Sequence, residues 1–167
     1  MTPVKISLRH FLRAILASSL THAATFSLLM CMFYSIVSGE TILGAIAFPV
    51  LCTVYISSYA MHELGHYHTA LHLRAQPILW IDANSVSVFS NPITIRHSQF
   101  IALAGPLSAV LWIVAWWGAL SLFLPALCFA ALIPGGLLAS AHLGSLLPVF
   151  SDGKALLQGL IKQRSYQ

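Results

Sequence analysis

The segment HELGH, at residues 62–66, has the residue types and the spacing of a hydrolytic metal site. Four residues turn a helix by about 400°, so His62 and His66 lie on one face, where two imidazole nitrogens can share one zinc ion at about 2.0–2.1 Å. Glu63 lies about 100° further round the helix, where its carboxylate can accept a proton from water without binding the metal. The pattern predicts one Zn2+ per chain, with His62 and His66 as metal ligands and Glu63 as the catalytic base.

A catalytic zinc site needs a third protein ligand, and the C-terminal half of the chain offers two candidates. Asp152 is preferred, because it is the only acidic residue in that half and sits where the last apolar segment ends. Its alternative role is the N-cap of a short terminal helix. His142 is the other candidate, although a hydrogen-bonded or substrate-side histidine is its simpler interpretation. His68 and His72 are expected to line the polar end of their helix.

The composition indicates a membrane protein. Of the 167 residues 58% are hydrophobic and 7% are charged, whereas roughly 25% are charged in soluble domains. A bilayer core of about 30 Å requires about 20 apolar residues per helix, and four windows meet this requirement, at residues 14–38, 42–66, 99–122 and 126–150. We therefore expect an all-α polytopic membrane protein with about four transmembrane helices.

Glu63 falls within the second of these windows. An ionised carboxylate at membrane depth costs at least about 2.5–3.5 kcal/mol, so such groups are usually retained for function. This interpretation places the metal site inside the bilayer, nearer to its cytoplasmic face. The competing interpretation is a helix end at the interface, with polar histidines and a snorkelling glutamate.

All lysine and arginine residues fall on one side of the predicted helices. They precede the first window, separate the second from the third, or follow the fourth: Lys5, Arg9, Arg13, Arg74, Arg96, Lys154, Lys162 and Arg164. The positive-inside rule then predicts that both termini are cytoplasmic, and we expect an integral protein of the bacterial inner (plasma) membrane. The net charge of +4 suits anionic lipid headgroups, so the lipid bilayer is an expected partner and nucleic acid is not.

Residues 77–97 interrupt the apolar pattern on the cytoplasmic side. Residues 86–88 and again 93–95 alternate between apolar and polar types, while Ala83-Asn84-Ser85 and Asn91-Pro92 are turn signals. These signals predict short strands, as a β-hairpin-like insertion between the second and third helices. A plain connecting loop is the alternative.

Three stretches together resemble the site-2 protease family of intramembrane zinc metalloproteases: HELGH at 62–66, IALAGPLSAVL at 101–111 and SLLPVFSDG at 145–153. The resemblance covers residues 42–156 and implies the small form of the family, without a PDZ or CBS domain. We expect residues 1–41 to be a cytoplasmic leader with an extra transmembrane helix, and residues 157–167 to be a cytoplasmic tail.

The resemblance also implies roles for individual residues. His62 and His66 match the two zinc-binding histidines, Glu63 the catalytic glutamate, and Asp152 the third ligand. Ala104, Gly105 and Pro106 match a helix-start motif that allows close packing beside the active site.

One departure from the family pattern concerns substrate handling. The family has an asparagine three residues before the proline of the last stretch, thought to help position substrate, and this chain has Ser145 there. The family also has four residues between that proline and the aspartate, and this chain has three. Ser145 and His142 are therefore possible substrate-side residues, and Gly105 and Pro106 possible helix-packing residues.

The function that these features imply is zinc-dependent endoproteolysis of a membrane-embedded protein or peptide near the cytoplasmic side. An unwound substrate segment is expected to add to the edge of one of the short strands. One alternative is an inactive family relative that binds a membrane partner, which the altered last motif would suit. The other is a small metal-handling transporter, which leaves the second and third stretches unexplained. The sequence gives no indication of the oligomeric state.

Overall fold

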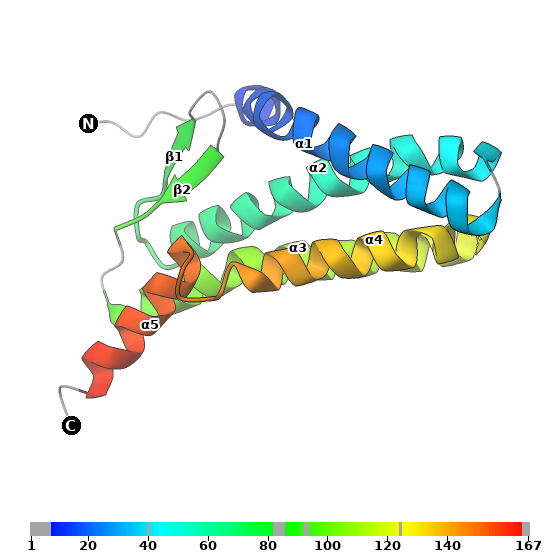
Figure 1. Cartoon of the computed structure of the whole chain (residues 1–167). Helices are drawn as coiled ribbons and strands as arrows, with labels where there is room; N and C mark the ends of the chain where they lie inside the picture. Colours follow the sequence, from blue (N-terminus) through cyan, green and yellow to red (C-terminus); the bar gives the residue numbers. More distant parts are fainter. Residues whose placement is uncertain (1–7, 40, 82–85, 92–93, 124, 165–167) are drawn as a thin grey trace.

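The structure is a computed structural model that describes residues 8–39, 41–81, 86–91, 94–123 and 125–164. Four long helices, a short terminal helix and one small hairpin make up the fold (Figure 1). The helices are α1 (Leu8–Ser38), α2 (Thr41–His72), α3 (Ile95–Phe123), α4 (Pro125–Gly144) and α5 (Ser151–Arg164). The hairpin, β1 (Ile78–Ile81) and β2 (Val86–Phe89), lies between α2 and α3 in the chain. The expected helical fold with an inserted hairpin is confirmed.

α2 is the central helix, and it packs against α1, α3 and α4. Cys31, Ala47 and Leu51 form a buried cluster between α1 and α2, and Val54, Ile113 and Leu138 form a second one among α2, α3 and α4. The hairpin and α5 lie at one end of the bundle, and the junctions α1–α2 and α3–α4 lie at the other (Figure 1).

The expected end of the fourth helix was wrong. The fourth apolar window runs to residue 150, but α4 ends at Gly144, because Pro148 lacks a backbone N–H and disfavours helix in the residue before it. Tight turns follow instead, in which Leu146 and Leu147 donate to the carbonyls of Leu143 (3.1 Å) and Gly144 (2.9 Å). These turns redirect the chain into α5.

The strand expected at residues 93–95 was also wrong, because Ile95 is the first residue of α3. The hydroxyl of Thr94 accepts a hydrogen bond of 3.1 Å from the backbone N–H of His97, which is the geometry of an N-cap. Alternation alone does not distinguish such a cap from a strand. Ile93, Pro92 and the turn expected at residues 83–85 lie outside the described residues.

The hairpin is antiparallel, with Leu79 opposite Val88 and Ile81 opposite Val86. Val86 is buried against α2 side chains, among them Ile56 and Leu64. The hydroxyl of Tyr59 donates a hydrogen bond of 3.0 Å to the carbonyl of Val86. The hairpin is thereby fixed to the same stretch of α2 that carries the metal motif.

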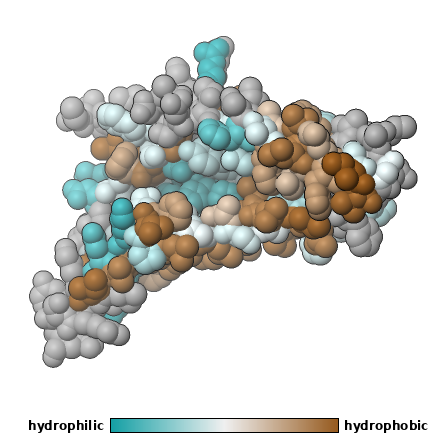
Figure 2. Space-filling view, in the orientation of Figure 1, coloured by the Kyte–Doolittle hydropathy of each residue, from teal (hydrophilic) through white to brown (hydrophobic). Residues whose placement is uncertain are grey.

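Among the described residues, α3 is the one helix long and apolar enough to cross a membrane by itself. Shorter apolar helical segments run over His22–Val37 and Leu132–Gly144. Figure 2 shows hydrophobic side chains gathered toward the end of the bundle away from α5, whereas hydrophilic and hydrophobic ones are mixed nearer to the hairpin and α5.

Candidate metal centre

His62 and His66 lie one turn apart on α2 and face the same way. Their Nε2 atoms are 3.1 Å apart, and both residues are buried, at 9% and 6% exposure. The helix continues well beyond this segment to His72, so the backbone geometry expected for the H-E-x-x-H spacing is present.

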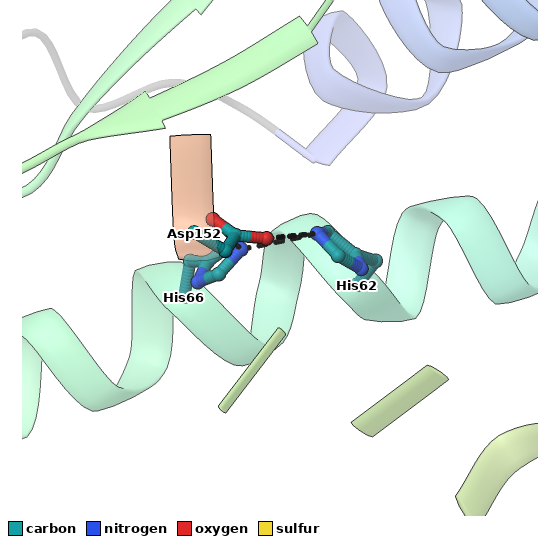
Figure 3. Close-up of side chains that lie close together, drawn as sticks. All are labelled: His62, His66 and Asp152. Carbon is teal, nitrogen blue, oxygen red and sulfur yellow. Dashed lines mark hydrogen bonds and ion pairs between the residues drawn. The ribbon is translucent and has the colours of Figure 1, made fainter. Parts of the chain in front are cut away.

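Asp152 completes the group from the far end of the chain (Figure 3). Its Oδ2 atom lies 3.4 Å from Nε2 of His62, and its Oδ1 atom lies 3.5 Å from Nε2 of His66. Asp152 sits in the first turn of α5, so it is part of a helix start while its carboxylate is directed at both histidines.

The turn before α5 brings Asp152 into place. The N–H of Gly153 donates to the carbonyl of Ser145 over 3.1 Å. A side chain at position 153 would overlap the backbone carbonyl of Leu147, so only glycine allows the chain to fold back this closely.

The three donor groups fit a metal ion of the zinc type. Bonds of about 2.0–2.2 Å at a tetrahedral angle place neighbouring donor atoms about 3.3–3.6 Å apart. The two Nε2 atoms are 3.1 Å apart, and they lie 3.4 and 3.5 Å from different oxygens of Asp152. With one ligand atom taken from each residue, the three atoms lie within 4.8 Å of one another. Two imidazoles and a carboxylate can therefore hold one metal ion here, and they leave a coordination position for a reactant.

The electrostatics of Asp152 favour its ionised form. Burial raises the pKa of its carboxyl, but the hydrogen bonds and charges of His62 and His66 outweigh burial and hold that pKa well below its usual range. The carboxylate is thus in the protonation state that a metal ligand requires.

Each ligand has a second partner that fixes its orientation. Nδ1 of His66 lies 2.6 Å from the carbonyl oxygen of Ile101 on α3, and Nδ1 of His62 lies 3.2 Å from Nδ1 of His142 on α4. Oδ2 of Asp152 accepts a hydrogen bond of 3.1 Å from the hydroxyl of Ser145. Outer partners of this kind are characteristic of metal sites.

Gly105 and Pro106 are both buried in α3. A Cβ atom at position 105 would overlap the imidazole ring of His66, so the missing side chain lets α2 and α3 approach closely. The expected helix start at this motif was wrong, because α3 begins at Ile95 and continues through Pro106. The helix has its N-cap at Thr94 instead.

Glu63 is buried at 7% exposure, beside the metal-binding group but outside it. Its carboxyl group lies near the backbone of Val88 in β2. An acidic group buried next to two histidines and an aspartate can exchange a proton with a molecule bound between them.

The two residues expected on the substrate side, His142 and Ser145, both contact metal-binding residues. They lie at the C-terminal end of α4 and directly after it. His68 and His72 are exposed on α2, and neither belongs to the group.

Sequence reasoning missed three partners of the site. Ser58, whose hydroxyl lies 3.2 Å from Nε2 of His142, is one helical turn before His62, so the four-residue spacing was an available signal. Tyr59 offered no comparable signal, because its partner Val86 is distant in the chain. The carbonyl of Ile101 is a backbone group, which a sequence cannot single out.

Comparison with protein-family models, with curated proteins and with solved structures gives no match to this chain.

Proposed function

We propose that the protein is a membrane-embedded zinc metalloendopeptidase of the site-2 protease type. The observation that carries the proposal is the buried His62, His66 and Asp152 group with the carboxyl group of Glu63 beside it. A hydrolytic zinc site needs three protein ligands and a group beside them that accepts a proton. Two imidazoles and one carboxylate, with the carboxyl group of Glu63 next to them, meet this requirement.

The membrane part of the proposal rests on the outer surface of the long helices. Large apolar side chains are at least half exposed on α1, α3 and α4, including Leu28, Leu29, Phe33, Ile36, Leu111, Val114, Phe123, Ile133 and Leu137. Apolar surface of this extent is typical of a lipid or protein interface, and we infer that α1–α4 all cross the bilayer.

The orientation that we propose is that of the positive-inside rule. The basic residues Arg74, Arg96 and Lys154 lie in or beside the hairpin and α5 segments, at one end of the bundle. That end would face the cytoplasm of a bacterial cell, with both termini on this side.

Within this proposal, each residue of the site has a defined task. His62, His66 and Asp152 would hold a zinc ion, which would supply a Lewis acid for a carbonyl group and for water. Glu63 accepts a proton from the attacking water and delivers it to the leaving amine, which is general acid–base catalysis by one carboxyl group.

The substrate would be a membrane segment in extended form, because the carbonyl groups of a helix are hydrogen-bonded and shielded. The backbone of Val86 exchanges hydrogen bonds with the hydroxyl of Tyr59, and the backbone of Val88 lies near Glu63 of α2. A strand added at this edge of β2 would bring a peptide carbonyl near the metal-binding group. We infer that the contact between Val88 and Glu63 is exchanged for a bond to the substrate.

The first experiment measures zinc per chain in detergent-purified protein, for the parent, His66→Ala and Asp152→Ala. We expect about one zinc in the parent and a large loss in both variants. His72→Ala is the matched control, because His72 is an exposed histidine on the same helix. A folded parent without zinc contradicts the proposal.

The second experiment compares membranes of cells that express the parent or Glu63→Gln. Mass spectrometry of new peptide termini should find cleavage within apolar segments only with the parent. Glu63→Gln should keep its zinc and lose at least about 100-fold in cleavage rate. Equal biological complementation by both proteins would instead support a role in binding a membrane partner.

A further inference from the structure

His142 contacts the imidazole ring of His62 on its Nδ1 side, which faces away from Asp152. Nδ1 of His142 lies 3.2 Å from Nδ1 of His62, whereas Asp152 contacts Nε2 of His62. The two rings lie 5.2 Å apart at 29°. Because the two nitrogens of an imidazole point in different directions, one metal ion cannot be shared by Nε2 of His62 and Nδ1 of His142. His142 is therefore placed as a partner of a ligand and not as a ligand.

The contact continues away from the metal group through a chain of hydrogen bonds. Nε2 of His142 lies 3.2 Å from the hydroxyl oxygen of Ser58. The hydroxyl of Ser58 donates over 2.9 Å to the backbone carbonyl of Tyr55. The chain thus ends on a carbonyl that can only accept, which provides an acceptor for the one proton of Ser58.

This acceptor makes one order of protons along the chain compatible with a metal ion on Nε2 of His62. When the Ser58 hydroxyl donates to Tyr55, it accepts from His142, which then carries its hydrogen on Nε2. Nδ1 of neutral His142 is consequently an acceptor, and the Nδ1–H of His62 donates to it. His62 is left with the lone pair on Nε2, the atom that faces His66 and Asp152. In the reverse order the hydrogen of His62 would lie on Nε2 and prevent metal binding.

We propose that His142 is a positioning residue that holds His62 in its metal-binding tautomer, with Ser58 fixing His142 in turn. The inference rests on the zinc site of the proposed function. A neutral histidine takes the place of the carboxylate or backbone carbonyl that commonly supports a metal-binding histidine, as the Ile101 carbonyl does for His66. His142 lies outside the group of donor atoms, so the substrate-side assignment is replaced by one directed at the metal.

Two substitutions separate the contacts of His142. In His142→Asn the amide oxygen replaces Nδ1 and keeps an acceptor for His62. In His142→Gln the amide group reaches the position of Nε2 and keeps only the contact with Ser58. His142→Leu removes both contacts at similar volume, and Ser58→Ala removes the far end of the chain. His72→Ala serves as the control for loss of a histidine.

The test uses the full-length protein in detergent and measures the dissociation constant for zinc by competition with a chelator. The absorption spectrum of the cobalt-substituted protein reports the ligand geometry. We expect zinc affinity to fall about 10–100-fold in His142→Leu and His142→Gln. The affinity of His142→Asn should stay within about threefold of the parent, and Ser58→Ala should lie between. The melting temperatures of the zinc-free proteins check the fold.

The outcomes distinguish this inference from the proposed function. A parent that binds no zinc overturns both. A parent that binds zinc, with His142→Leu binding it equally well, overturns the positioning role alone. Equal weakening in His142→Asn and His142→Gln also overturns it, because only packing around the ring would then matter. If His142→Leu does not fold, the comparison of the Asn and Gln variants decides the question.

Discussion

Ser145 donates a hydrogen bond of 3.1 Å to Oδ2 of Asp152, so the residue that follows α4 holds the carboxylate that begins α5. The same hydroxyl lies 2.8 Å from the carbonyl of His142 and has one proton to donate. An ionised carboxylate is the stronger of the two acceptors. Ser145 thus supports a side chain of the group that could bind a metal ion.

Ser145→Ala should therefore weaken zinc binding about 10-fold, toward the lower end of the range for outer partners of metal ligands. The variant keeps Asp152 in place but loses the hydrogen bond from the Ser145 hydroxyl that orients its carboxylate. Chelator competition on the purified protein measures the effect. Ser151→Ala is the control, since Ser151 is exposed beside Asp152; equal affinities of Ser145→Ala and the parent would disprove the role.

Gly105→Ala should damage the site and the packing of α3 on α2 together. The added methyl group overlaps the ring of His66, and overpacking of this kind costs typically 1–3 kcal/mol. Gly118→Ala is a matched control on the same helix, because a Cβ at 118 has no heavy atom within 4 Å. We expect a lower melting temperature and weaker zinc binding in Gly105→Ala, and neither change in Gly118→Ala.

Tyr59→Phe should loosen the hairpin from α2. The variant loses the hydrogen bond to the carbonyl of Val86, which is worth about 1 kcal/mol. Amide hydrogen exchange over residues 86–89 should then become about fivefold faster, while zinc binding is unchanged. Tyr67→Phe removes a hydroxyl elsewhere on α2 and should leave exchange in β2 as in the parent.

The proposed topology predicts opposite accessibility at the two ends of the bundle. Single cysteines at Phe123 and Gln158, both exposed residues, are introduced into a protein without Cys31, Cys52 and Cys128. A membrane-impermeant maleimide should label position 123 in intact spheroplasts and position 158 only after permeabilisation. Labelling of both positions from outside would refute the orientation.

Because the pKa of the Asp152 carboxyl group is lowered in the folded chain, we expect the stability of the zinc-free protein to depend on pH. This pKa is lower in the folded chain than the unperturbed value of about 3.9, so the folded state binds fewer protons than the unfolded state in this range. The stabilisation is complete above about pH 5 and is lost as the pH falls. The difference in melting temperature between the parent and Asp152→Asn should shrink from pH 5 toward pH 3, and a constant difference would contradict this.

The sequence was sufficient to predict an inserted hairpin and its strand β2, because the alternation at residues 86–88 is a local signal. It did not locate β1, because the residues 78–81 are all apolar and give no alternation. It also predicted the face shared by His62 and His66, since that depends on helix geometry alone. The end of α4 and the start of α3 were harder, because Pro148 and Thr94 act through local hydrogen bonding that hydropathy does not report. The contacts of His142 and Ser145 depend on how α4 and α5 fold back on α2, so no spacing along the chain reveals them.

The metal-binding group also has a consequence for the C-terminal end of the protein. His62 and His66 belong to α2, whereas Asp152 belongs to α5, which packs mainly against α3 and leaves Leu157 and Ile161 exposed. An ion bound by all three would cross-link distant parts of the chain and reduce the freedom of the segment between them. The ion would add to the packing of α5 on α3 and hold the terminal helix more firmly to the bundle. Removal of the ion would then loosen α5 before the rest of the fold, and limited proteolysis should cleave the C-terminal end first.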